Sequence, residues 1–359
     1  MKQLITGDEA VARGAWEAGV RFASAYPGTP STEILENIAT YKEIHAEWAP
    51  NEKTALESVI GASLAGARAI ASMKHVGLNV AADPFFTFAY MGVNAGAVVV
   101  TADEPGQFSS QNEQDNRNYA KAAMTPMFEP SDSQECKDML LEAFEISEQY
   151  DIPVLFRMTT RVCHSKSLVE LGERQDVPLK PYVKNIKKYV AVPANARPMK
   201  VKVLANQELL KGYSNNCQWN RVEMHEPSVG VICSGDCYLY AREEFGDGAS
   251  YLKLGFTNPL PDDLIRDFAS KVEKICIIEE NDPYIEEHVR ALGIACDGKN
   301  VFPRYGEMKP EVIRSVIYGE EYPLDETSRA AVNPRPPTLC AGCPHRGFFY
   351  ELGRRKNVM

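Results

Sequence analysis

The sequence has 359 residues, 44% of them hydrophobic and 25% charged, a balance typical of a folded protein with two or three domains. Its 49 acidic and 39 basic residues give a net charge of −10, and no basic stretch stands out, which argues against nucleic acid as a partner. The first 20 residues are interrupted by acidic side chains. We therefore expect no signal peptide, no membrane association and a cytoplasmic location. Nine cysteines, mostly single within apolar segments like those around Cys233 and Cys276, are typical of reduced core thiols.

The first 170 residues alternate between two hydrophobic patterns. Helical spacing of apolar residues predicts helices, and short apolar runs between them predict buried strands. Strands separated by helices favour a doubly wound, mostly parallel α/β sheet. In chain order we expect a helix at 7–20, a strand at 20–25, helices at 32–41 and 54–68, a strand at 69–77, a helix at 82–94, a strand at 96–106, a helix at 133–149 and a strand at 152–162.

The pattern weakens in residues 176–225, where lysines and prolines predict a linker with local helix and a solvated basic surface. A second, smaller α/β unit follows in residues 226–320. Its sequence predicts a strand, a turn and a helix twice in succession, and then another buried strand at 271–282. The proline-rich segment NPRPPT (333–338) marks a further boundary, so residues 321–359 predict a linker and the truncated start of another domain.

Several loops in the first unit follow predicted strands, where parallel sheets bind their ligands. The loop YPGTPST (26–32) has turns stiffened by Pro27, a flexible Gly28 and the hydroxyl of Thr29 near a helix start. A capped helix after a tight turn explains the sequence of this loop equally well. The functional alternative is a set of backbone donors and a hydroxyl that face a carboxylate ligand.

Three further segments carry candidate site residues. Glu52 precedes a small-residue helix, where it complements the helix dipole or, in an apolar cleft, bonds a ring nitrogen. His75 follows a strand and has Gly77 and Asn79 beside it; it is either a structural histidine or a ligand contact. The polar run SSQNEQDNR (109–117), which includes Gln111, is too polar for a core and predicts a solvated loop or a substrate lid.

The cysteine and glycine motifs of the sequence are weaker indications of a functional site. Cys340 and Cys343 form a CxxC pair with His345 after it, which is half of a zinc or iron–sulfur site. No GxGxxG and no GxxxxGK[ST] occurs, so a dinucleotide or P-loop nucleotide site is unsupported. The segment Gly-Asp-Gly at 246–248 follows a helical pattern and predicts a surface turn.

Several longer sequence motifs occur in order along the chain: AYPGTPSTEI, NEKTALESVIGASLAGARA, MKHVGLNVAADP, SSQNEQDNR, EPSDSQE, NPLP, IIEENDPYIEEH and LCAGCPHRG. Together they resemble the large subunits of indolepyruvate ferredoxin oxidoreductases, members of the thiamine-diphosphate-dependent 2-oxoacid:ferredoxin oxidoreductase family. The resemblance covers essentially the whole chain. It implies a pyrimidine-binding domain at 1–175, a linker at 176–225, a transketolase-C-terminal-like domain at 226–320 and a truncated diphosphate-binding domain within 321–359.

The resemblance also implies residue roles. Glu52 falls on the glutamate that contacts N1′ of the thiamine pyrimidine, and Thr29 on the threonine that faces the substrate carboxylate. Related enzymes have an arginine that binds the substrate carboxylate where this chain has Thr101-Ala102-Asp103. The residue that binds the substrate carboxylate in this chain is therefore not assigned. The remaining implied contacts are Pro27, Gly28, His75, Gly77 and Asn79 for the cofactor, Gln111 for the substrate, and Cys340 and Cys343 for an iron–sulfur cluster.

The implied reaction is the oxidative decarboxylation of indolepyruvate and other aryl 2-oxoacids with coenzyme A to aryl-acetyl-CoA and carbon dioxide, with reduction of ferredoxin. The implied cofactors are thiamine diphosphate, Mg²⁺ and 4Fe-4S clusters; the partners are a smaller β subunit, a second copy of the chain and ferredoxin. We expect these 359 residues alone to bind thiamine diphosphate poorly and to lack activity. The alternatives are a non-catalytic subunit of the same fold and a non-oxidative thiamine-dependent lyase.

Overall fold

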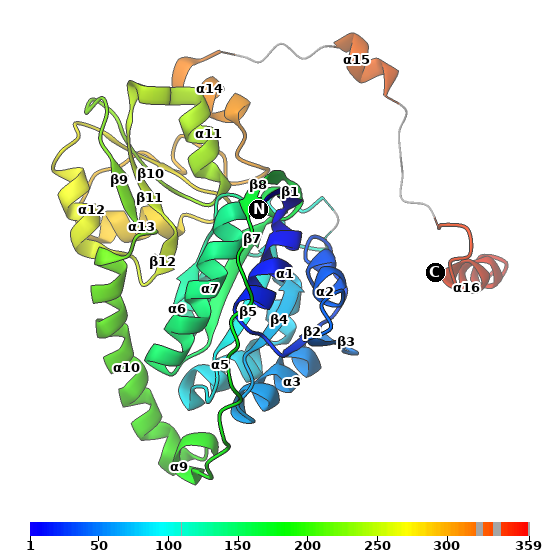
Figure 1. The fold of residues 1–359 in the computed structure, drawn as a ribbon. Helices are drawn as coiled ribbons and strands as arrows, with labels where there is room; N and C mark the ends of the chain where they lie inside the picture. The colour runs from blue at the N-terminus through cyan, green and yellow to red at the C-terminus, as the bar shows by residue number, and fades with distance from the viewer. Residues whose placement is uncertain (109, 321–325, 333–338, 358–359) are drawn as a thin grey trace. The chain divides into compact units, whose positions relative to one another are not determined.

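The computed structural model describes residues 1–108, 110–320, 326–332 and 339–357, which form two compact units, residues 1–319 and 320–359 (Figure 1). A seven-stranded sheet with the order β12-β6-β7-β5-β4-β2-β3 forms the centre of the first unit. All neighbouring strands in it are parallel except β12 and β6. Its strands are β2 (Phe22–Ala25), β3 (His45–Trp48), β4 (Ala69–Lys74), β5 (Ala97–Asp103), β6 (Met127–Phe128), β7 (Val154–Thr159) and β12 (Phe256–Asn258).

Helices cover both faces of this sheet, because its central strands are apolar on both sides and β5 is buried along its whole length. One apolar core lies between the sheet and α1 (Gly7–Glu17), α2 (Thr32–Ile38) and α7 (Ser133–Tyr150). The other core contains residues of α3 (Glu52–Leu64), α4 (His75–Val80), α5 (Ala82–Met91) and α6 (Arg117–Ala123). The expected doubly wound, mostly parallel α/β fold is thus confirmed.

A second sheet, with the order β13-β10-β11-β9, also belongs to the first unit. In this sheet β13, β10 and β11 are parallel, whereas the edge strand β9 is antiparallel to β11. The chain then leaves this sheet and adds β12 to the seven-stranded sheet, which joins the two sheets. The elements are β9 (Arg221–Glu223), β10 (Gly230–Ser234), α11 (Asp236–Phe245), β11 (Ser250–Leu254), α12 (Asp262–Ala269), β13 (Ile275–Ile278), α13 (Tyr284–Ala291) and α14 (Pro310–Tyr318).

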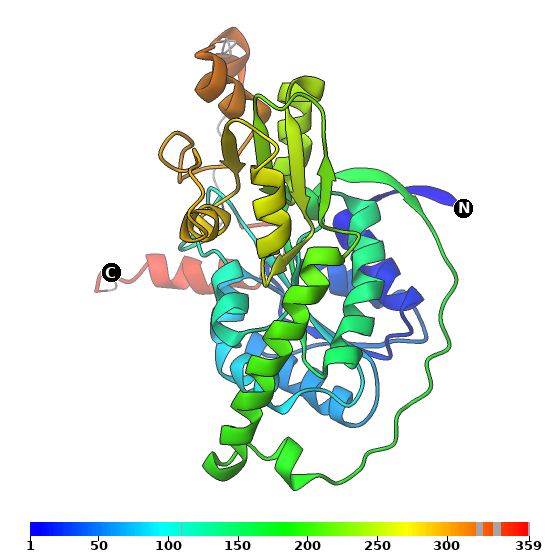
Figure 2. The same ribbon diagram turned by 90° about the vertical axis from the view of Figure 1, so that its left-hand side faces the viewer.

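The segment expected to be a linker contains a long helix. After α9 (Ile186–Tyr189), α10 (Pro193–Asn216) runs for 24 residues and contacts α5 and α12. Figure 2 shows α10 in front of the seven-stranded sheet and the extended chain before α9 along the right-hand side of the view. An additional antiparallel pair, β1 (Lys2–Thr6) and β8 (Lys166–Glu170), brings α8 (Thr160–His164) close to α1.

The second unit contains α15 (Glu326–Ala331) and α16 (His345–Gly353). The NPRPPT segment, on which a boundary was predicted, lies outside the described residues, as does Ser109 of the polar run. Within the described ranges, no helix has both the length and the apolar character needed to cross a bilayer.

Candidate functional site

The candidate residues of the first unit lie at the carboxyl edge of the seven-stranded sheet, as the strand pattern predicts. The loop after β2 packs on the end of β4, because Gly28 leaves room for the Lys74 side chain. A Cβ atom on Gly28 would lie 3.1 Å from Cδ of Lys74. The loop that contains Gly28 and the segment that begins at His75 are therefore neighbours in the fold.

Glu52 is held at the first position of α3. Asn51 caps this helix, with its Oδ1 atom accepting a hydrogen bond of 2.9 Å from the backbone amide of Thr54. The Glu52 side chain turns inward and is only 8% exposed. It packs on Gly77 of α4, where a Cβ atom would lie 2.7 Å from Cγ and 2.8 Å from Oε1 of Glu52. Two of the predicted residues thus meet in direct contact.

The Glu52 carboxyl group has no hydrogen-bond or ion-pair partner within the described ranges of the chain. A nearly buried carboxyl group normally has such a partner. A ring nitrogen of a bound aminopyrimidine would supply one, so the residues present fit this part of thiamine diphosphate.

His75 is fully buried at the start of α4. Its Nε2 atom lies 2.9 Å from the backbone oxygen of Asn112, and its Nδ1 atom has no partner in the described part of the chain. The Asn116 side-chain amide donates to the His75 carbonyl oxygen at 3.3 Å. These bonds attach the loop before α6 to the start of α4.

The other predicted residues lie nearer the surface. Asn79 is exposed, and its amide donates a hydrogen bond of 2.8 Å to the hydroxyl of Tyr119. Pro27, Thr29 and Gln111 are exposed. Among the described interactions, neither Thr29 nor Gln111 bonds to Glu52, so their roles stay predictions.

The end of the polar run is not a solvated loop. Asp115, Asn116 and Arg117 are buried, in contrast to the expectation that this text is too polar for a core. The reason is compensation of charge: Arg117 donates to Asp115 and, at 2.7 Å, to Glu279 at the end of β13. Although burial opposes it, the charge of Arg117 holds the pKa of Asp115 below its usual value.

A second buried arginine, Arg157, lies beside Asp103, the last residue of the segment Thr101-Ala102-Asp103. Nε of Arg157 on β7 donates to Asp103 at 2.7 Å, and its other nitrogens donate to Glu129 at 2.6 Å and to Asn281 at 2.9 Å. Burial raises the pKa of Asp103, although Arg157 opposes the shift. Asp103 thus serves as the partner of a buried arginine that links both sheets. Two features of the sequence could have indicated this buried charge network: an arginine, Arg157, within an apolar strand, and the acidic residues that follow β13.

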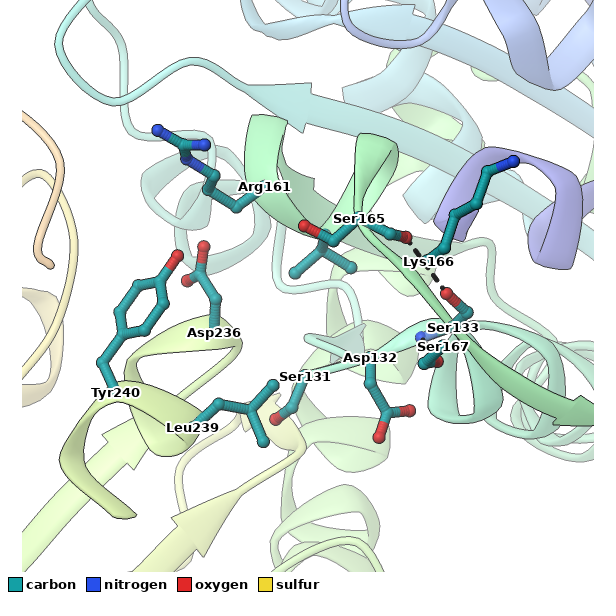
Figure 3. Close-up of a pocket in the computed structure, with 11 residues that line it drawn as sticks. Ser131, Asp132, Ser133, Arg161, Ser165, Lys166, Ser167, Asp236, Leu239 and Tyr240 are labelled. Atoms are coloured by element: carbon teal, nitrogen blue, oxygen red, sulfur yellow. Dashed lines mark hydrogen bonds between the residues drawn. The ribbon is translucent and has the colours of Figure 1, made fainter. Parts of the chain in front are cut away.

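A pocket of about 140 Å³ lies away from these residues, between the starts of α7 and α11 and the helix α8 (Figure 3). Arg161, Asp236 and Tyr240 line one side of it, and serines from α7 and the start of β8 line the other. Burial raises the pKa of Asp236, whose Oδ2 atom accepts a hydrogen bond of 2.7 Å from Thr159. None of the predicted site residues lines this pocket.

Cys340 and Cys343 belong to the second unit, before α16. The Sγ atom of Cys343 lies 3.4 Å from Nδ1 of His345. Cys233 and Cys276 are buried free thiols, as predicted, and Gly246–Gly248 forms a short turn whose Asp247 is exposed, also as predicted.

The fold is shared with thiamine-enzyme-like proteins of known structure. A 2-oxoglutarate:ferredoxin oxidoreductase from Magnetococcus marinus, solved with 2-oxoglutarate, coenzyme A and succinyl-CoA bound, superposes with a TM-score of 0.74 at 20% identity over 89% of this chain and 65% of that one. A split-gene transketolase, an inactive β4 tetramer, matches with a TM-score of 0.54 at 15% identity over 87% of this chain and 97% of that one.

The chain belongs to the pyruvate flavodoxin/ferredoxin oxidoreductase family with a thiamine-diphosphate-binding domain, whose family model matches residues 13–214. It is 43% identical to the indolepyruvate oxidoreductase subunit IorA of Methanothermobacter marburgensis and 40% identical to that of Archaeoglobus fulgidus, each over 98% of this chain. It spans about 60% of the length of these relatives. The resemblance expected from the sequence words is thus confirmed.

Proposed function

We propose that this chain is part of the catalytic subunit of an enzyme that oxidatively decarboxylates indolepyruvate and other aryl 2-oxoacids. The aryl 2-oxoacid and coenzyme A give aryl-acetyl-CoA, carbon dioxide, a proton and two electrons, which reduce ferredoxin. Membership in the family and the identity to two IorA subunits support the class of reaction. The aryl specificity rests on the names of those relatives.

The observation that carries the proposal is the inward-facing carboxyl group of Glu52, which packs on Gly77 and has no partner among the residues that the structure describes. When bound, thiamine diphosphate supplies a carbanion centre that attacks the substrate's keto carbon and accepts the electrons released with carbon dioxide. Glu52 shares a proton with a ring nitrogen of the aminopyrimidine and so sets its tautomer. Glu52 is thus the catalytic residue proposed for this chain.

The neighbouring segments complete the proposed site. Pro27, Gly28, His75, Gly77 and Asn79 shape the cofactor-binding edge. Thr29 and Gln111, both exposed, are the proposed substrate contacts. Mg²⁺, 4Fe-4S clusters (with Cys340 and Cys343 as ligands), a smaller β subunit, a second copy of the chain and ferredoxin complete the proposed enzyme.

The test is an assay of the full-length protein with its β subunit, thiamine diphosphate and a low-potential acceptor. We expect acceptor reduction that requires both an arylpyruvate and coenzyme A, with indolepyruvate turned over faster than pyruvate or 2-oxoglutarate. Decarboxylation without coenzyme A and without acceptor reduction would favour the non-oxidative lyase. Absence of any turnover, together with absence of cofactor binding, would favour the non-catalytic subunit.

A further inference from the structure

Three side chains with metal-ligand chemistry meet at the ends of α1, α2 and α8. Asp8 lies in the first turn of α1, Glu33 in the first turn of α2, and His164 at the end of α8. One oxygen from each acid and one ring nitrogen of His164 all lie within 4.8 Å of one another. Nε2 of His164 is 3.9 Å from Oε2 of Glu33, too far for a hydrogen bond. The three groups therefore face one another without bonding.

The acidic oxygens of this cluster lack donors. Both carboxyl oxygens of Asp8 and the Oε2 atom of Glu33 are buried and meet no nitrogen or oxygen donor within the described residues. Asp8 is fully buried. Buried polar atoms almost always have a partner. Unpartnered acidic oxygens whose residues each place one oxygen within 4.8 Å of the same imidazole nitrogen therefore indicate a missing positive group.

The surroundings of Asp8 do not provide that group. The charged side chains beside Asp8 are Glu9 and Glu33, both acidic, and the neighbouring Cys163 thiol is only a weak donor. A proton on Asp8 would supply a single donor for three unbonded oxygens. A divalent cation would instead contact both acids and neutralise their two charges.

We propose that Asp8, Glu33 and His164 bind one divalent transition-metal ion. Two carboxylates and an imidazole form a mixed oxygen and nitrogen set that suits ions such as Mn²⁺, Fe²⁺ or Zn²⁺. The side chains of His164 and Glu33 are 43% and 47% exposed, which leaves an entry path and room for water ligands. The Asp8 side chain, held in the core, provides the fixed ligand.

The ion would tie three helix ends together. Because α2 begins directly after the loop that carries Gly28 and Thr29, the ion would also hold the end of this loop. It is a structural ion and takes no part in the proposed reaction, so the inference is independent of the proposed function.

Manganese is the probe of choice, because Mn²⁺ prefers carboxylate and imidazole ligands to the thiolates of the CxxC pair. Bound Mn²⁺ is counted by electron paramagnetic resonance on the full-length protein after removal of thiamine diphosphate and other metals. We expect the wild type to bind one more Mn²⁺ per chain than His164→Gln, in which binding at this site weakens at least about tenfold. The exposed His45, which lies 3.3 Å from Glu47, offers a matched control, and His45→Gln keeps the wild-type count.

A second variant tests the buried ligand. Mn²⁺ should raise the melting temperature of the wild type and leave that of Asp8→Asn unchanged. Equal Mn²⁺ counts in the wild type and His164→Gln would overturn the proposal, and so would an equal Mn²⁺-dependent shift in Asp8→Asn. If Asp8→Asn does not fold, the exposed His164 decides the question alone.

Discussion

The Cα atom of Gly77 lies against the side chain of Glu52, so closely that a Cβ atom at position 77 would come within 2.7 Å of the Glu52 Cγ atom. This contact joins the first residue of α3 to the middle of α4 across the carboxyl edge of the sheet. Glycine at position 77 therefore determines where the Glu52 carboxyl group is held.

A methyl group at position 77 should displace this carboxyl group. We expect Gly77→Ala to lower kcat/KM at least about tenfold, because an error of about 1 Å in a reacting group is sufficient for such a loss. Gly61 in α3 provides the matched control, since a Cβ atom there meets nothing within 4 Å. Gly61→Ala should keep full activity. Wild-type kinetics in Gly77→Ala would show that the position of Glu52 does not matter.

The buried arginine at the start of α6 should dominate the link between the two sheets. Arg117→Met leaves Asp115 and Glu279 buried without their counter-charge, which costs about 3–5 kcal/mol. Arg304 pairs with Asp282 at 3.1 Å on the surface, so Arg304→Met should change stability by less than about 1 kcal/mol. Urea unfolding of both variants checks this difference. Similar unfolding midpoints for the two variants would contradict it.

Asp8 should make the metal-free protein less stable as the pH rises. The folded-state pKa of this carboxyl group is about 8, against a usual value of 3.8. Between these values the unfolded chain releases the proton while the folded chain retains it, so stability is lost from about pH 4 to about pH 8. In chelator, Asp8→Asn should gain stability relative to the wild type between pH 5 and pH 8, by on the order of 3 kcal/mol. Denaturation at both pH values measures this gain.

A constant difference between Asp8→Asn and the wild type across this pH range would mean that Asp8 titrates normally in the folded protein. The ionisable groups that face it come from α1, α2, α7 and α8. They are Glu9, Glu33, Cys136, Cys163 and His164. Of these, His164 is controlled by repeating the measurement in His164→Gln.

Periodicity was sufficient to predict the parallel sheet and its flanking helices. Each long helix or apolar strand produces a pattern within its own stretch of sequence. The side chains of β5 are apolar on both sides, because helices cover both faces of the sheet. The strand β6 was missed, because it has only two residues and its pairing with β12 joins segments more than 120 residues apart. Such a contact depends on tertiary packing and leaves no periodic signal.

In the candidate site, too, local patterns could be predicted from the sequence and long-range contacts could not. Loops after strands could be assigned to one edge of the sheet from the general geometry of parallel sheets, and the structure brings Gly28 near Lys74 and Glu52 near Gly77. Buried charge could not be predicted locally. Asp115 and Arg117 are polar residues in the sequence, and their burial is stabilised by groups more than 160 residues later, such as Glu279.

The most direct test of the account is the turnover of Glu52→Gln in the complete enzyme, with the exposed Glu57→Gln of the same helix as the control. Gln keeps the shape of the side chain and removes its shared proton. The account predicts a loss of kcat of at least about 100-fold with an unchanged melting temperature, since positioned proton transfer contributes about 10²–10⁴ in rate. Turnover equal to that of Glu57→Gln would contradict the proposed catalytic role.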